Sequence, residues 1–131
     1  MYTKSGLMTK SNRAEGIDVY IQFLNVALKH AKEAPISQLD ADEVALLQAI
    51  ALKDFAGEPA KVMDAMKFDT LGSPATLHRR LGRLRTLGLV EVTADAFDSR
   101  IKYLKVSELV QDYFARMGKA LLKAGVVPLK K

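Results

Sequence analysis

SPATLHRRLGRLRTLGLV, residues 73–90, carries the clearest structural signals in the chain. Ser73 is suited to cap a helix, and Pro74 suits the first helical position, where no N–H donor is needed. Three leucines recur at helical spacing and form one apolar stripe: Leu77, Leu81 and Leu84. Gly88 is a typical helix stop. We therefore predict a helix that begins after Ser73 and ends at Gly88.

The face of this helix opposite the leucines is basic and contains small residues: Ala75, Thr76, Arg79, Gly82, Arg83 and Thr86. Arg80 lies on one flank, His78 and Arg85 lie on the other, and residues 73–90 contain no acid. Arginines among small residues suit close approach to guanine edges and phosphates. A mid-helix glycine costs about 1 kcal/mol against alanine, and close approach would account for Gly82. A solvated basic surface has the same composition, so the helix alone leaves both interpretations open.

The composition sets wide bounds on the class of protein. The 131 residues are 49% apolar and 27% charged, which suits one globular domain with a real core. The chain has no cysteine, which excludes a disulfide framework and a thiolate metal site and fits the cytoplasm. The net charge of +5 favours an anionic partner, either nucleic acid or a membrane surface. No apolar run approaches the roughly 20 residues of a membrane span, and we expect no membrane association.

The order of elements before the basic helix predicts a helix-turn-helix. We expect a flexible basic arm over residues 1–14 and a single winged-helix domain over residues 15–131. Asp40 and Glu43 form a capping-box-like start to a helix that ends at Gly57, and its acidic first turn complements the helix dipole. Pro59 predicts the start of a second helix, which runs to about Phe68 and has three inward residues: Val62, Met63 and Met66. The basic helix then follows a turn and completes the pair.

After Gly88 the apolar period changes from 3.6 to 2. Residues 89–92 and 101–106 read as two strands joined by a loop, which predicts a β-hairpin wing. Arg100 and Lys102 lie near the loop, where they would reach a minor groove or the DNA backbone. Asp98 is placed to hold Arg100. An ordinary hairpin with solvated charges is the alternative.

Amphipathic helices flank the winged core of residues 38–106. Residues 15–34 carry two apolar stripes, which predict packing partners on two sides. A second subunit would supply the second partner, and deep burial within the monomer is the alternative. Ser107 is suited to cap a last helix over residues 108–124. The fold class we predict is mainly α with a small β-hairpin wing, flanked by N- and C-terminal dimerisation helices.

Several local motifs resemble those of the MarR-type winged helix-turn-helix family. They are Ser73-x-x-Thr76, Arg79, Leu84, Gly88-Leu89-Val90 and Asp98-x-Arg100. The resemblance implies a homodimer on a palindromic operator, with one recognition helix and one wing for each subunit. Members are commonly transcriptional regulators, often released from DNA by a small ligand. The DNA-binding residues we predict are Ser73, Ala75, Thr76, His78, Arg79, Arg80, Arg83, Arg100 and Lys102.

The predicted function is therefore sequence-specific binding of double-stranded DNA by a homodimeric transcriptional regulator. A winged-helix protein-interaction module that does not bind DNA is the alternative. We expect no enzyme, no cofactor and no metal site, because His30 and His78 lie in different helices without an acid or nucleophile at a recognisable spacing. A small-molecule effector is left open: Tyr20, Leu24 and Tyr113 would line a pocket, but core packing explains them equally well.

Overall fold

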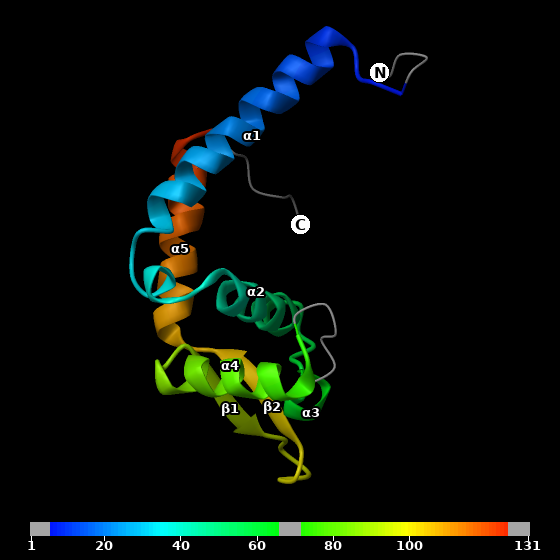
Figure 1. The fold of residues 1–131 in the computed structure, drawn as a ribbon, viewed down its shortest axis with the longest axis vertical. Coiled ribbons are helices and arrows are strands. Elements are labelled where there is room, and N and C mark those ends of the chain that lie inside the picture. The colour runs from blue at the N-terminus through cyan, green and yellow to red at the C-terminus, as the bar shows by residue number, and fades with distance from the viewer. Residues whose placement is uncertain (1–5, 66–71, 126–131) are drawn as a thin grey trace. The chain divides into compact units, whose positions relative to one another are not determined.

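The computed structural model describes residues 6–65 and 72–125, and it contains helices and one hairpin (Figure 1). In chain order the elements are α1 (Lys10–His30), the 3-10 helix η1 (Ile36–Gln38), α2 (Ala41–Phe55), α3 (Val62–Ala65), α4 (Pro74–Thr86), β1 (Val90–Ala94), β2 (Lys102–Val106) and α5 (Glu108–Lys123). The chain divides into two compact units, residues 34–113 and residues 1–33 with 114–131. The predicted fold, mainly helical with a two-stranded wing, is confirmed.

The capping box at the start of α2 is formed as predicted. The Glu43 N–H donates to Asp40 Oδ1 at 2.8 Å, and the Asp40 N–H donates to Glu43 Oε1 at 2.9 Å. Because both helix-end donors are satisfied, α2 begins sharply at Ala41. Its apolar stripe faces the core of residues 34–113 and consists of Leu46, Leu47 and Ile50.

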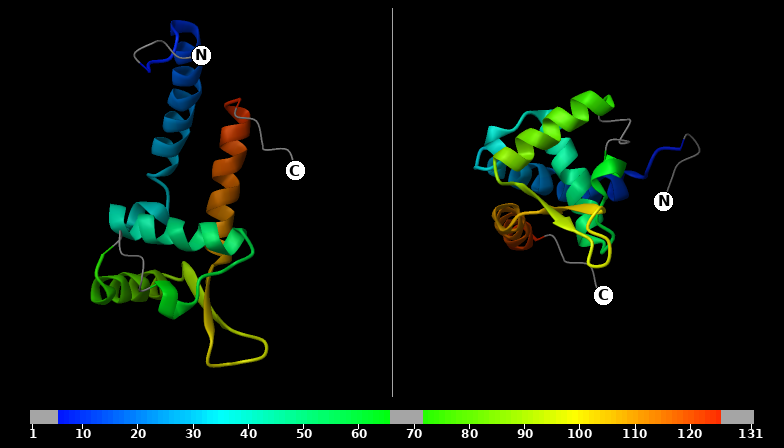
Figure 2. Two further views of the ribbon diagram at one scale, coloured as in Figure 1. Left: turned by 90° about the vertical axis from the view of Figure 1, so that its right-hand side faces the viewer. Right: turned by 90° about the horizontal axis from the view of Figure 1, so that it is seen from below.

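Helix α4 also begins and ends where the sequence predicts. The Thr76 N–H donates to Ser73 Oγ at 3.3 Å, and Pro74 takes the first turn. At the other end Gly88 adopts a φ of 75°, and the Leu89 N–H reaches the Leu84 carbonyl at 2.9 Å, as in a Schellman cap. The three leucines predicted for the apolar stripe are all buried (Leu77, Leu81 and Leu84). α2 lies along one side of α4 in both Figure 1 and Figure 2.

The wing is antiparallel, with its register running from Val90↔Val106 to Ala94↔Lys102. A third segment joins its edge: the Leu104 N–H donates to the Ala60 carbonyl at 2.8 Å, and Lys61 forms a bridge with Tyr103. The prediction that Pro59 opens a helix is therefore wrong. The extended backbone after Pro59 satisfies the Leu104 N–H on the free edge of β2, and helix α3 starts only at Val62.

The inward residues predicted for that second helix are only partly right. Val62 is half-buried, but Met63 is 80% exposed, so its inward placement is wrong. Ala65 is buried instead. Val62 and Ala65 are three residues apart and share the inward face, whereas Met63 lies about 100° around the helix from Val62. Met66 and the predicted helix end near Phe68 lie outside the described residues.

In the other unit, α1 is longer at its start than predicted. It begins at Lys10, so residues 10–14 belong to a helix and not to the predicted arm. Their polar composition suggested an arm, but Lys, Arg and Ala are good helix formers and no proline or glycine interrupts them. The helix ends at His30, before the predicted boundary, and the Glu33 N–H then closes a turn onto the His30 carbonyl at 3.0 Å.

Burial separates α1 from the other long helices. In the described part of the chain no α1 residue is buried, and its exposed large apolar residues are Ile17, Val19, Tyr20, Ile21, Phe23 and Leu28. The rings of Tyr20 and Phe23 stack with centroids 6.0 Å apart. α5 buries Val110 and Tyr113. The cap predicted for α5 is wrong, because the buried Ser107 Oγ has no hydrogen-bond partner among the described residues and only its carbonyl engages the helix.

Candidate nucleic-acid interface

The exposed face of α4 is a basic surface with its apolar side turned into the core. We define this face by Ala75, Arg79, Gly82, Arg83 and Thr86, all of which are exposed. One flank adjoins the start of α2, and the other adjoins β1. A Cβ atom added at Gly82 would have no atom of the described residues within 4 Å, leaving aside its two chain neighbours and the local backbone of α4. Packing among the described residues therefore does not require glycine at this position.

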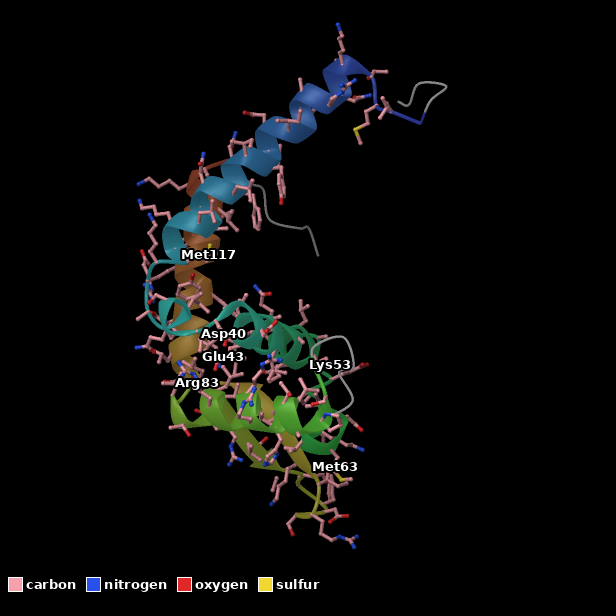
Figure 3. All side chains as sticks on the ribbon, viewed as in Figure 1. Asp40, Glu43, Lys53, Met63, Arg83 and Met117 are labelled. Carbon is pink, nitrogen blue, oxygen red and sulfur yellow. The ribbon has the colours of Figure 1, made fainter. Side chains whose placement is uncertain are left out.

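Two arginines of α4 are held by the first turn of α2 and the residues before it. Arg83 Nε lies 2.7 Å from Glu43 Oε2, and Arg83 Nη2 donates to the Gln38 carbonyl at 2.8 Å. Arg80 Nη2 lies 3.1 Å from Asp42 Oδ2. Figure 3 shows Arg83 of α4 beside Asp40 and Glu43 at the start of α2. These contacts fix the direction of two guanidinium groups before any ligand binds.

Glu43 is the centre of this arrangement. The residue is only 4% exposed, and its two carboxylate oxygens serve different partners, the Asp40 N–H and Arg83 Nε. A buried carboxylate is costly unless it is paired and hydrogen-bonded, and here both conditions are met. The helix dipole alone therefore does not explain this acid. Glu43 positions a residue of α4, and the sequence analysis missed that role.

Arg79 and Arg85 stand apart from these tethered arginines. Both are exposed, and neither forms an ion pair within residues 6–65 and 72–125. An open cleft of about 500 Å³ lies between α4 and the start of α2, lined by Gln38, Leu39, Asp40, Glu43, Arg79, Arg80 and Arg83. A second hollow of about 590 Å³ lies between α4 and β1, lined by Gly82, Arg85, Thr86, Val90, Glu91 and Val92. The exposed face of α4 is thus a ridge between two hollows.

The wing loop, residues 95–101, is built around two aspartates. Asp98 binds Arg100 through both oxygens, with Nε and Nη2 each at 3.0 Å, so Asp98 holds Arg100 as predicted. Asp95 accepts hydrogen bonds from the Phe97 N–H at 2.9 Å, the Asp98 N–H at 3.0 Å and the Tyr103 hydroxyl at 3.0 Å. Both carboxylates therefore point into the loop.

These hydrogen bonds also set the acidity of the loop. Donors to the carboxylate, first of all the Phe97 amide, lower the pKa of Asp95. The Arg100 side chain lowers the pKa of Asp98, and the same pair raises the pKa of Arg100. The bond to Asp95 raises the pKa of the Tyr103 hydroxyl. All of these shifts favour the ionised aspartates that hold the loop together.

The structure places the predicted binding residues in two groups. The α4 group contains the helix-start residues and the four central ones: Ser73, Ala75, Thr76, His78, Arg79, Arg80 and Arg83. Ser73 and Thr76 also serve the helix cap, since Ser73 Oγ donates to Thr76 Oγ1 at 3.0 Å. Arg100 and Lys102 form the wing group, and both are exposed.

Among the described residues, no cluster of three or more histidine, cysteine or acidic side chains is placed to hold a metal ion. Within the same residues, no helix has the length and apolar content to cross a bilayer. His78 is exposed on α4, whereas His30 Nδ1 contacts Glu33 at 3.1 Å. Of the residues considered for an effector pocket, Tyr20 is exposed, Leu24 is half-buried and Tyr113 is buried.

Residues 34–113 define the class of fold. A short helix, a second helix with an exposed basic face and an antiparallel hairpin follow one another, which is the arrangement of a winged helix-turn-helix. Comparison of the sequence with protein-family models gives no match, and comparison with curated proteins gives no significant match.

Solved structures share this fold. A MarR-like transcriptional regulator of Thermotoga maritima, TM0816, is 16% identical, with 87% of this chain and 82% of that chain covered and a TM-score of 0.58. The transcriptional regulator TM0710 of the same organism is 17% identical, with coverages of 86% and 75% and a TM-score of 0.58. Streptococcus pneumoniae FabT, solved in complex with DNA, is 13% identical, with coverages of 93% and 85% and a TM-score of 0.51. The predicted resemblance to MarR-type winged helices is confirmed at the level of fold.

Proposed function

We propose that this protein is a sequence-specific regulator of transcription that binds double-stranded DNA, and not an enzyme. The observation that carries the proposal is the exposed face of α4. The face is free of acids, it holds an arginine without an ion pair among the described residues, and it is open around Gly82. Similarity in fold to FabT, which was solved with DNA, and to regulators such as TM0816 supports the same function. A cytoplasmic location follows from this role.

In the proposed complex α4 lies in the major groove. Arg79 is exposed on this face and suits a bidentate contact with a guanine edge. Arg83 keeps Nη1 outside its bonds to Glu43 and Gln38, so it can contact a phosphate while it stays tethered. Ser73 and Thr76 at the helix start, and His78 and Arg80 on the flanks, add contacts to the backbone of the duplex.

The wing supplies the second contact. Arg100 is held by Asp98 with one side of its guanidinium, which leaves Nη1 for the minor groove or its phosphates. Lys102 follows on β2 and adds a positive charge to the same edge. Each subunit would therefore contact both grooves.

A homodimer is part of the proposal because the residues that the structure describes leave much of the apolar face of α1 exposed. Six large apolar residues of α1 are more than two-fifths exposed in the monomer (Ile17, Val19, Tyr20, Ile21, Phe23 and Leu28). A contiguous apolar helix face of this kind is typical of a protein interface. Two-fold symmetry would place two α4 helices about one DNA turn apart on a palindromic site.

Selection of bound duplexes from a random DNA pool at near-physiological salt tests the proposal. We expect enrichment of an inverted repeat with half-sites about one turn apart. Binding without an enriched motif would indicate a protein that contacts only the backbone. No retained duplex, even at low salt, would contradict DNA binding and favour the protein-interaction module.

A further inference from the structure

Phe97, in the wing loop between β1 and β2, is 99% exposed and so buries almost none of its ring. An exposed apolar residue is common, but full exposure of a phenyl ring is costly in water. The ring is therefore unexplained by packing within the described chain.

The backbone on both sides of Phe97 is fixed, so the ring is held outward. Asp95 accepts the Phe97 N–H at 2.9 Å and the Asp98 N–H at 3.0 Å. The Ile101 N–H closes the loop by donating to the Asp98 carbonyl at 3.0 Å, and the Asp95 N–H donates to the Ile101 carbonyl at 2.9 Å. The loop thus orders an aromatic tip before it meets a partner, which lowers the entropy cost of binding.

The charges around the tip fit an anionic partner. Asp95 and Asp98 balance Arg100 and Lys102 in formal charge, but the aspartate oxygens are turned toward donors within the loop, which include Nε and Nη2 of Arg100. Lys102 and the rest of the Arg100 guanidinium face solvent. The neighbours Ala96 and Ser99 are small and exposed, so they leave the ring clear. An apolar ring with cations beside it matches the minor groove, where phosphates line the walls and side chains such as Phe enter between base steps.

We propose that Phe97 is a minor-groove wedge that enters between two base pairs of the duplex and kinks it beside the half-site. The proposal rests on the proposed function, because it requires that the protein binds DNA. The ring would unstack a flexible pyrimidine–purine step, such as TA, and so add a sequence preference outside the bases read by α4.

The chain has no tryptophan, so Phe97→Trp places a single fluorophore at the tip. With a duplex from the selection, we expect its emission to be quenched at least about twofold and its accessibility to acrylamide to fall. The matched control is Leu52→Trp, at an exposed position on α2, whose emission should stay unchanged. Phe97→Ala should lower affinity about tenfold, as expected from loss of one base–aromatic stack, and reduce the DNA bend.

The outcomes separate this proposal from the proposed function. One outcome contradicts only the wedge: wild-type protein binds the duplex, the indole of the Phe97→Trp variant stays accessible to acrylamide, and Phe97→Ala binds and bends DNA normally. In that case the proposed function as a DNA-binding regulator is unaffected. A duplex with 2-aminopurine at the proposed step reports unstacking of that base. If the indole is protected but the duplex stays unbent and the 2-aminopurine stays stacked, the wedge proposal is also wrong. Protection that appears without DNA and grows with protein concentration would assign the ring to self-association instead. Failure of the wild-type protein to retain any duplex would overturn both proposals.

Discussion

Helices α4 and α1 carry the same kind of apolar stripe but use it differently. In α4 the leucine stripe is buried within residues 34–113, and the basic face is left exposed. In α1 no residue is buried, and the apolar residues are the exposed ones. A helical apolar stripe therefore predicts a helix without saying what covers it. In α4 the fold covers the apolar stripe, and in the proposed function DNA meets the polar face, whereas the apolar face of α1 would be covered by a second subunit.

The largest expected effect is on the α4 side of this comparison. Leu84 is 0% exposed, so Leu84→Ala should lower the free energy of unfolding by about 2–5 kcal/mol. Leu28→Ala is the matched control, because Leu28 of α1 is 64% exposed and its truncation leaves no cavity in the monomer. Urea unfolding at low protein concentration measures both. Equal destabilisation by the two variants would break the contrast between the helices.

The next prediction concerns assembly through α1. Tyr20→Asp should raise the dimer dissociation constant about 100-fold, because it places a charge in the centre of an apolar interface. Leu52→Asp is the matched control on an exposed apolar position of α2. Sedimentation velocity gives the monomer–dimer equilibrium of each variant. If Tyr20→Asp dimerises like the wild type, α1 is not the interface and the exposed stripe needs another explanation.

Substitutions on the polar face of α4 should weaken DNA binding, whereas substitutions of its leucines should lower the free energy of unfolding. Arg79→Ala should weaken specific DNA binding by about 1–3 kcal/mol and relax base preference at one position, with the free energy of unfolding unchanged. Arg83→Ala is the informative comparison. It should weaken binding and also destabilise the fold, because it leaves the buried Glu43 carboxylate without its cation.

Titration of labelled duplexes at several salt concentrations, together with urea unfolding, measures both effects. Each lost phosphate contact should reduce the slope of log affinity against log salt by about 1. If the Arg79→Ala variant binds and selects DNA like the wild type, Arg79 is not one of the residues that contact bases. If the Arg83→Ala variant unfolds with unchanged free energy, the contacts of Arg83 with Glu43 and Gln38 do not stabilise the fold.

Gly82→Ala should change stability and DNA binding in opposite directions, and both effects should be smaller than those of the arginine variants. Glycine costs roughly 1 kcal/mol in a helix interior, and an added methyl group meets no described atom outside the local helix backbone and neighbours, so the variant should be more stable. The same methyl group would stand between α4 and the floor of the groove and should weaken DNA binding severalfold. Thermal unfolding and duplex titration provide the two readings. A stabilised variant with unchanged affinity would show that α4 does not approach DNA at this point.

Local signals account for the features that were predicted well from the sequence. Caps depend on side chains three residues apart, so the Asp40–Glu43 box and the Ser73 cap were readable without tertiary information. The period of the leucines and the φ of Gly88 are equally local. The two strands of the wing were readable from the change of apolar period to 2, but their register was not predicted, because it depends on which residues of β1 and β2 meet across the loop.

Long-range contacts account for the features that could not be predicted. The pairing of Ala60 with Leu104 joins segments far apart in the chain, and no pattern near Pro59 signals it. The same holds for Arg83 and Glu43, because an acid in the first turn of a helix is expected from the sequence alone and gives no sign that it pairs with α4. Phe97 lies in a loop, where one apolar residue has no period to mark it.

The smallest predicted effect is the pH response of the wing, which neither helix shares. The folded-state pKa of Asp95 is lowered, so its contribution to stability is present above the unfolded-state pKa, near 3.8, and is lost as pH falls through the folded-state value. The amide signals of Phe97 and Asp98 should therefore hold constant from neutral pH to about pH 4 and shift only below it. Asp95→Asn should remove the Asp95 step from the Phe97 amide signal while the signals of α4 follow the wild type, because the side-chain amide of asparagine does not titrate. The Asp98 amide keeps the step of its own carboxyl, whose pKa is also lowered. Two-dimensional NMR across the acid range measures both sets of signals together. A wing that changes near neutral pH would show that Asp95 does not hold the loop, and the fixed presentation of Phe97 and Arg100 would lose its basis.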